Sequence, residues 1–185
     1  MNQPIVEFAI EIATEAHKNQ MRKGMDLPYI THPFSVGMLL ARSGCSDEVI
    51  AAGILHDVVE DTPLTLDDVR RDFGDHIASI VEGCSEPDRS LSWEDRKQHT
   101  IEFLKTASFE VRLVACADKL HNVRSMALAY KEIGDAIWNR FKRGRKPQAW
   151  YYRGLVESLC TEEDREGLAL FQAFEQEVEN LFGSA

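Results

Sequence analysis

The chain has 185 residues, of which 44% are hydrophobic and 28% are charged. These proportions are typical of a folded domain and exclude disordered and fibrous proteins. Its 31 acidic residues outnumber its 21 lysines and arginines, and the formal net charge of −10 disfavours a nucleic-acid binder. A small phosphorylated ligand in a local basic pocket remains compatible with that charge. Because no apolar run is long enough to cross a membrane and no signal peptide is evident, we expect a cytoplasmic protein without a membrane partner.

Helix signals dominate the chain. Ser46 begins a segment with apolar residues at helical spacing, and capping residues with an acid three positions later begin others at Thr65, Ser92 and Thr161. Prolines and glycines mark further helix starts and ends at Pro4, Pro33, Pro63, Gly44, Gly74 and Gly83. An apolar stripe of Phe171, Phe174, Val178, Leu181 and Phe182 predicts a C-terminal helix. Since no segment alternates convincingly enough to demand a strand, we expect an all-α fold of about eight to ten helices.

We expect one domain over residues 1–185, with no repeat or linker. Its motif-bearing core covers about residues 16–124, and helices within 125–185 complete the pocket and the core. Longer loops are predicted at residues 23–30 and 85–91. The four cysteines are far apart in the sequence and are predicted to be reduced thiols.

The segment from Gly53 to Thr62 is the most informative about function, because it contains the pair His56-Asp57 in an apolar helical context. Burying such a pair is costly unless something satisfies it, and a divalent metal would do so. His32 stands next to a proline that marks a helix start, and Asp118 interrupts another apolar helical run. Two histidines and two aspartates from three segments would leave coordination positions open for water and substrate.

Four ordered blocks carry a family resemblance: Arg22-Lys23-Gly24, the segment from Pro28 to Pro33, the segment from Leu55 to Thr62, and the segment from Ala117 to Arg124. They resemble the HD superfamily of metal-dependent phosphohydrolases, and in particular the hydrolase domain of RelA/SpoT proteins and the stand-alone small alarmone hydrolases. The resemblance implies an all-α fold, a Mn²⁺ cofactor and removal of the 3′-pyrophosphate from ppGpp or pppGpp. The products would be GDP or GTP and pyrophosphate. Too few residues follow Leu159 for a nucleotide-synthesising domain, so we expect a chain that degrades its nucleotide and does not make it.

The resemblance also implies roles for individual residues. The metal ligands are His32, His56, Asp57 and Asp118. Glu60 and Asp61 match the acidic pair that orients and deprotonates the attacking water, and their i+4 spacing from His56 and Asp57 places all four on one helical side. The residues that match substrate contacts are Arg22, Lys23 and Asn122, and Tyr29 is a candidate wall of the pocket.

A second basic cluster lies at residues 138–153, where positive charges alternate with aromatic side chains. We predict that Lys142, Arg145 and Tyr151 or Tyr152 contact phosphate or ribose. A basic helix end that packs against acidic neighbours is the structural alternative, and nucleic-acid binding is disfavoured by the net charge.

Several alternatives stay open at this point. The same metal site could act as a phosphohydrolase or phosphatase on another phosphorylated nucleotide, such as ppApp or NADPH. A different class would be an antitoxin-like protein that binds a partner. The ligand types also suit Fe²⁺, Co²⁺ or Zn²⁺, and a homodimer is compatible with a helical domain. His17 is expected to pack or to support a ligand, and the remaining histidines, His76, His99 and His121, are not expected to be ligands.

Overall fold

The computed structural model describes residues 3–86, 90–161 and 169–183. The chain divides into two compact units, one made of Met1–Pro87 with Ser108–Asp118 and the other of Asp88–Ala107 with Lys119–Ala185. The expected all-α fold is confirmed: within the described ranges the only β contact is an isolated bridge between Met21 and Pro28. That the whole chain forms a single domain stays a prediction.

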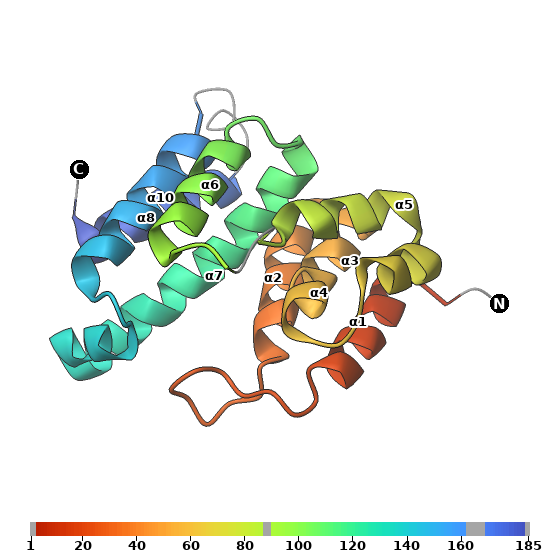
Figure 1. Ribbon diagram of the computed structural model, residues 1–185, viewed down its shortest axis with the longest axis horizontal. Coiled ribbons are helices and arrows are strands. Elements are labelled where there is room, and N and C mark those ends of the chain that lie inside the picture. The colour runs from red at the N-terminus through yellow and green to blue at the C-terminus, as the bar shows by residue number, and fades with distance from the viewer. Residues whose placement is uncertain (1–2, 87–89, 162–168, 184–185) are drawn as a thin grey trace. The chain divides into compact units, whose positions relative to one another are not determined.

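The first unit is built around one short apolar helix. It contains α1 (Ile5–Ala16), α2 (Thr31–Arg42), α3 (Asp47–Leu55), α4 (Val58–Asp61), α5 (Leu66–Cys84) and the first part of α7 (Phe109–Ile133). Every residue of α3 from Val49 to Leu55 is buried, and α1, α2 and α5 pack against it (Figure 1). This position explains why α3 is apolar on all sides, whereas an exposed helix would have a polar face.

The helix starts predicted at Ser46, Thr65 and Ser92 are confirmed, whereas α2 begins at Thr31, two residues before the start predicted at Pro33. Ser46 Oγ accepts a hydrogen bond from the N–H of Val49, and Ser92 Oγ accepts one from the N–H of Asp95. Thr65 and Asp68 form a reciprocal capping box at the start of α5. The start predicted at Thr161 extends into residues 162–164, which lie outside the described residues.

Two glycines behave as expected and one does not. Gly44 follows α2 with φ +75°, and Gly74 interrupts α5 with φ +85°, both in the region that favours glycine. Gly83 was expected to end a helix, but α5 continues through it to Cys84. A Cβ on Gly83 would lie 2.7 Å from Val111 Cγ2, so this position needs a small residue because α5 and α7 approach closely there.

A pair of glycines brings α2 and α3 close together. A Cβ on Gly37 of α2 would lie 2.7 Å from Ile54 Cγ1, and one on Gly53 of α3 would overlap Leu40 Cδ1. Any larger side chain at either position would push the helices apart. His32 lies at the beginning of α2, and His56 directly follows the end of α3.

The second unit contains α6 (Trp93–Leu104), the rest of α7, the 3₁₀ helix η1 (Gly134–Arg140), α8 (Arg145–Leu159) and α10 (Ala169–Phe182). Helix α8 packs against both α6 and α10 (Figure 1). The predicted stripe on α10 is buried, and Ser158 Oγ on α8 donates to Ile101 O on α6 at 2.8 Å. Across the described residues, none of the helices combines the length and the apolar character that a membrane span requires. The four cysteines are thiols, as predicted.

Candidate metal centre

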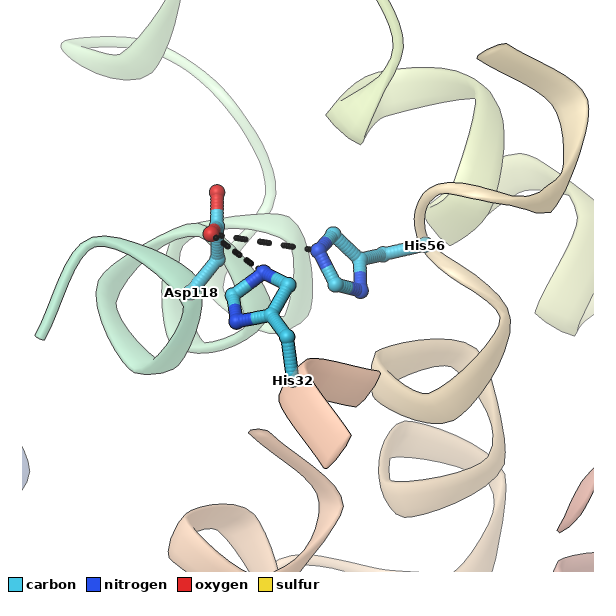
Figure 2. Close-up of side chains that lie close together, drawn as sticks. All are labelled: His32, His56 and Asp118. Carbon is cyan, nitrogen blue, oxygen red and sulfur yellow. Dashed lines mark ion pairs between the residues drawn. The ribbon is translucent and has the colours of Figure 1, made fainter. Parts of the chain in front are cut away.

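Three segments of the first unit supply the predicted ligands. His32 lies in the first turn of α2, and Asp118 lies in α7. The sequence predicts His56 and Asp57 within one apolar helix, whereas the structure ends α3 at Leu55 and begins α4 at Val58. The pair therefore lies in the turn between two helices. The side chains of His32, His56 and Asp118 point toward one another (Figure 2).

The distances between the ligand atoms fit a single cation. His32 Nε2 lies 3.1 Å from Asp118 Oδ1, and His56 Nε2 lies 3.9 Å from the same oxygen (Figure 2). Asp57 Oδ2 lies 3.0 Å from His56 Nε2 and 3.7 Å from His32 Nε2. Ligands bonded at about 2.0–2.2 Å to one ion are themselves about 3–4 Å apart. His32, His56 and Asp118 are thus brought together at the spacing that one ion requires, and Asp57 lies beside both histidines.

Burial and hydrogen bonding make His56 a suitable ligand. Its side chain is 3% exposed, and its Nδ1 lies 2.8 Å from the carbonyl oxygen of Gly53, to which it donates. Its Nε2 faces the carboxylates but has no partner with the angles of a hydrogen bond in the part of the chain that the structure describes. A buried nitrogen in this state is costly, and a bound cation would satisfy it. These residues therefore fit a divalent metal.

The electrostatics of the two histidines differ in the metal-free protein. Burial lowers the pKa of His32 more than Asp118 raises it, so this imidazole is neutral. Burial also opposes protonation of His56, but the carboxylates of Asp57 and Asp118 outweigh it and raise the pKa of His56 to about 9. In return, the His56 imidazolium lowers the pKa of Asp57 against the effect of burial. The metal-free centre therefore holds a proton on His56 that a cation would displace.

Tyr29 has a more specific place than the predicted pocket wall. Its hydroxyl donates to Asp57 Oδ2 at 2.5 Å, and its ring lies edge-on to His32 with centroids 5.8 Å apart. Burial and the Asp57 carboxylate both raise the pKa of Tyr29, so the hydroxyl keeps its proton and remains a donor. Tyr29 therefore orients a predicted ligand.

The acidic pair lies in α4, directly after the metal ligands. Helix α4 has one turn, and the N–H of Asp61 bonds to Asp57 O at 2.9 Å, so helical geometry continues from the metal-ligand pair into the acidic pair. The main-chain N–H of Glu86 donates to Glu60 Oε2 at 3.3 Å, which restrains this carboxylate. The predicted i+4 relation of His56 to Glu60 and of Asp57 to Asp61 is consistent with this local geometry.

The basic pair of the first unit lies on the loop between α1 and α2. The N–H of Arg22 donates to Leu27 O at 2.8 Å, which closes the loop around residues 23–26. The Arg22 guanidinium lies over the Tyr29 ring, 5.8 Å from its centroid, and Lys23 is exposed. A guanidinium beside an aromatic ring and an exposed ammonium are groups that can bind a nucleotide.

The other predicted substrate contacts belong to the second unit, which includes α7 from Lys119 onward. Asn122 lies one turn later in α7, and Lys142 is exposed between η1 and α8. The Arg145 guanidinium donates to Leu181 O at 3.2 Å and lies over the ring of Trp138, contacts that favour a packing role. The Tyr151 side chain is buried, with Lys97 Nζ 5.0 Å from its ring centroid.

Two residues near the centre were not singled out as site residues from the sequence. Gln20 Nε2 donates to the carbonyl oxygen of Asp61, and Gln20 Oε1 lies 2.5 Å from His17 Nδ1. The contact of Gln20 with Asp61 spans 41 residues, so no local sequence pattern could predict it. The available signal was the short spacing of His17 and Gln20 just before Arg22.

Comparisons with known proteins agree with this geometry. A family model described as the HD domain matches residues 9–147. The GTP pyrophosphokinase of Streptomyces coelicolor is 38% identical over 130 residues, which cover 69% of this chain and 15% of that protein. The chain therefore matches a small part of that relative's length.

Two further relatives are closer in extent to this chain. The zebrafish (Danio rerio) guanosine-3′,5′-bis(diphosphate) 3′-pyrophosphohydrolase MESH1 is 38% identical over 120 residues, which cover 63% of this chain and 66% of that protein. The solved structure of a metazoan SpoT orthologue that hydrolyses ppGpp superposes with a TM-score of 0.80 at 25% identity. That match covers 99% of this chain and 98% of the other.

Proposed function

Because this chain belongs to the HD-domain family, we propose that it is a metal-dependent hydrolase that removes the 3′-pyrophosphate from ppGpp and pppGpp. The products are GDP or GTP and pyrophosphate. The observation that carries the proposal is the buried cluster of His32, His56 and Asp118, whose ligand atoms all lie within 4.8 Å of one another. The choice of substrate is supported by the activity named for the zebrafish relative and for the metazoan SpoT orthologue.

The proposed cation is Mn²⁺, held by His32, His56, Asp57 and Asp118. Imidazole and carboxylate together also suit Fe²⁺, Co²⁺ and Zn²⁺. When bound, such a cation supplies Lewis acidity, which polarises a phosphate group and lowers the pKa of a water molecule.

We assign the proton transfer to Glu60. As general base, its carboxylate takes a proton from the attacking water while the water oxygen bonds to the phosphorus attached to the 3′-oxygen. The bond from that phosphorus to the 3′-oxygen breaks, the leaving oxygen takes up a proton from solvent, and Glu60 returns the proton it accepted to solvent. The hydrogen bond from the Glu86 N–H restricts the orientations of the Glu60 carboxylate, so less conformational entropy is lost when this group reacts. Asp61 is assigned to orienting the same water.

We also propose substrate contacts. Arg22 and Lys23 supply a planar guanidinium for the purine and an ammonium for phosphate. Contacts of Asn122, Lys142, Arg145 and Tyr151 with substrate stay predictions, and the contacts of Arg145 within the second unit favour a packing role for it. A homodimer and a cytoplasmic location also stay predictions.

The test is separation of reaction products by ion exchange. The protein is stripped of metal, incubated with ppGpp, and assayed again after addition of Mn²⁺. GDP and pyrophosphate that form only with metal are expected. Release of single phosphates would make the protein a phosphatase, and turnover of ppApp or NADPH in place of ppGpp would change the substrate. Full metal occupancy without turnover of any of these would contradict the proposal and favour a protein that binds a partner.

The role of Glu60 is tested with Glu60→Gln. The variant should bind Mn²⁺ as the wild type does and lose about 10²- to 10⁴-fold in kcat, the usual contribution of a general base. Glu11→Gln, on the exposed side of α1, is the matched control and should keep full activity. A fully active Glu60→Gln with bound metal would show that another group accepts the proton.

A further inference from the structure

The one-turn helix α4 is too short to be stable without contacts to the rest of the protein. A helix of four residues has few internal hydrogen bonds, and its last carbonyl groups have no partners within the helix. Yet this turn connects the ligand Asp57 to Glu60 and Asp61. Contacts from outside the turn must therefore determine where these carboxylates lie.

One such contact comes from the segment that follows α1. Gln20 Nε2 donates to the carbonyl oxygen of Asp61 at 2.5 Å, across 41 residues of sequence. The carbonyl oxygen of Gln20 accepts from the N–H of Tyr29 at 2.9 Å, and the Tyr29 hydroxyl bonds to Asp57. Gln20 is thus connected to both ends of the acidic turn. Its side chain bonds to the carbonyl oxygen of Asp61 at the end of the turn, and its main chain bonds to Tyr29, which bonds to Asp57 at the start.

The hydrogen-bonding capacity of these groups determines the orientation of Gln20. A main-chain carbonyl oxygen accepts and cannot donate, so the NH₂ of Gln20 must face Asp61 and its Oε1 must face His17. Since Oε1 also accepts only, His17 Nδ1 carries the proton and donates to it at 2.5 Å. His17 therefore prevents the amide of Gln20 from turning over.

The surroundings of His17 support its role in fixing the orientation of the Gln20 amide. The residue is 1% exposed, at the end of α1, and its ring packs on Tyr29 with centroids 5.0 Å apart. Its Nε2 is buried and meets no hydrogen-bond partner among residues 3–86, 90–161 and 169–183. In the described part of the chain, the hydrogen bond to Gln20 is therefore the polar contact that the ring makes.

We infer that His17 and Gln20 are positioning residues that hold the Asp61 end of α4, so that Glu60 and Asp61 face the metal centre. This inference rests on the proposed function for its kinetic part. Its structural part, that Gln20 holds the turn in place, stands without it. Both residues act through the main chain of α4 and not on the reacting atoms.

The experiment uses Gln20→Ala, which removes the donor from a half-buried site, and Asn19→Ala, an exposed neighbour, as the control. The first readout is hydrogen exchange of the amides of Asp61 and Thr62, which bond to Asp57 O and Val58 O. Exchange at both amides should be about 10-fold faster or more in Gln20→Ala, since a lost contact of about 1.4 kcal/mol corresponds to tenfold. Unchanged exchange overturns the inference, whatever the activity of the protein.

The second readout is steady-state kinetics with ppGpp at saturating Mn²⁺. In Gln20→Ala, kcat should fall about 10- to 100-fold through misplacement of the acidic pair, with Mn²⁺ affinity and KM unchanged. Faster exchange with an unchanged kcat, or a loss that follows Mn²⁺ affinity, would overturn the positioning role. A wild-type protein without activity on ppGpp would defeat the proposed function, and the exchange result would still decide the structural part.

His17 is tested by comparing two replacements. His17→Asn keeps an N–H close to the position of Nδ1 and should retain most of the wild-type kcat. His17→Leu removes the donor and should behave like Gln20→Ala. Equal kcat values for the two His17 variants would mean that the imidazole acts through packing alone and would overturn its assignment. If His17→Leu fails to fold, the kcat of His17→Asn and the two readouts on Gln20→Ala still decide the inference.

Discussion

The close approach of α2 and α3 can be tested by adding one methyl group at Gly37. The new Cβ of Gly37→Ala would lie 2.7 Å from Ile54 Cγ1 and 3.0 Å from Ile54 Cδ1. Ordinary contacts between carbon atoms are about 3.5–4.0 Å, so the methyl group is about 1 Å too close. Ile54 is 3% exposed, so its side chain can shift only against other packed groups.

The expected magnitude has two opposing parts. Overpacking of a dense core costs about 1–3 kcal/mol, while alanine in place of glycine within a helix gains about 1 kcal/mol. With overpacking near the middle of that range, Gly37→Ala lowers the free energy of unfolding by about 1 kcal/mol. In an Ile54→Ala background the opposing atoms are gone, so the same substitution should raise the free energy of unfolding by about 1 kcal/mol.

The assay is a double-mutant cycle, with urea unfolding of the four proteins followed by far-ultraviolet circular dichroism. Ile54→Ala alone should cost about 2–5 kcal/mol, and the coupling energy between the two sites should be about 2 kcal/mol. Met38→Ala, an exposed residue of α2, serves as control and should be additive with Ile54→Ala. An effect of Gly37→Ala that is the same in both backgrounds, within about 0.5 kcal/mol, would refute the close packing of these helices.

Three further predictions concern the metal centre. Asp118→Asn should weaken Mn²⁺ binding at least about tenfold in calorimetric titration, because a neutral amide replaces a carboxylate ligand; unchanged affinity would remove Asp118 from the ligand set. Tyr29→Phe should lower metal affinity about 10- to 100-fold because it frees the Asp57 carboxylate, and an affinity equal to the wild type would contradict that orienting role. The metal-free protein should be more stable at pH 6.5 than at pH 9.5, because the folded-state pKa of His56 is raised to about 9 from its ordinary 6.5. This stabilisation is complete below pH 6.5, is lost as pH rises through about 9, and amounts to about 3 kcal/mol. Urea titrations across this range check it, and a metal-free protein that gains stability as pH rises would contradict it.

The sequence predicted the elements whose causes are local. Caps at Ser46, Thr65 and Ser92 were readable because each side chain bonds to a main-chain group three residues away. The break of α5 at Gly74 was readable because the backbone conformation there favours glycine. Gly83 was misread, since its small size serves the approach of Val111 from a distant helix.

The sequence by itself also determined the chemistry available at the centre. Its histidines and aspartates, with Glu60 and Asp61 one turn beyond the central pair, already indicated a cation and a base. Residue types and their spacing are properties of the sequence and do not depend on how the helices pack.

Only the tertiary structure decided how these groups meet. It placed His56 and Asp57 in a turn, bonded Tyr29 to Asp57 across 28 residues, and attached Gln20 to Asp61 across 41. Hydrogen bonds within a helix join residues about four apart, so nothing in the local pattern encodes such contacts. They exist because the packing of α1 and α2 around α3 brings distant segments within hydrogen-bonding distance.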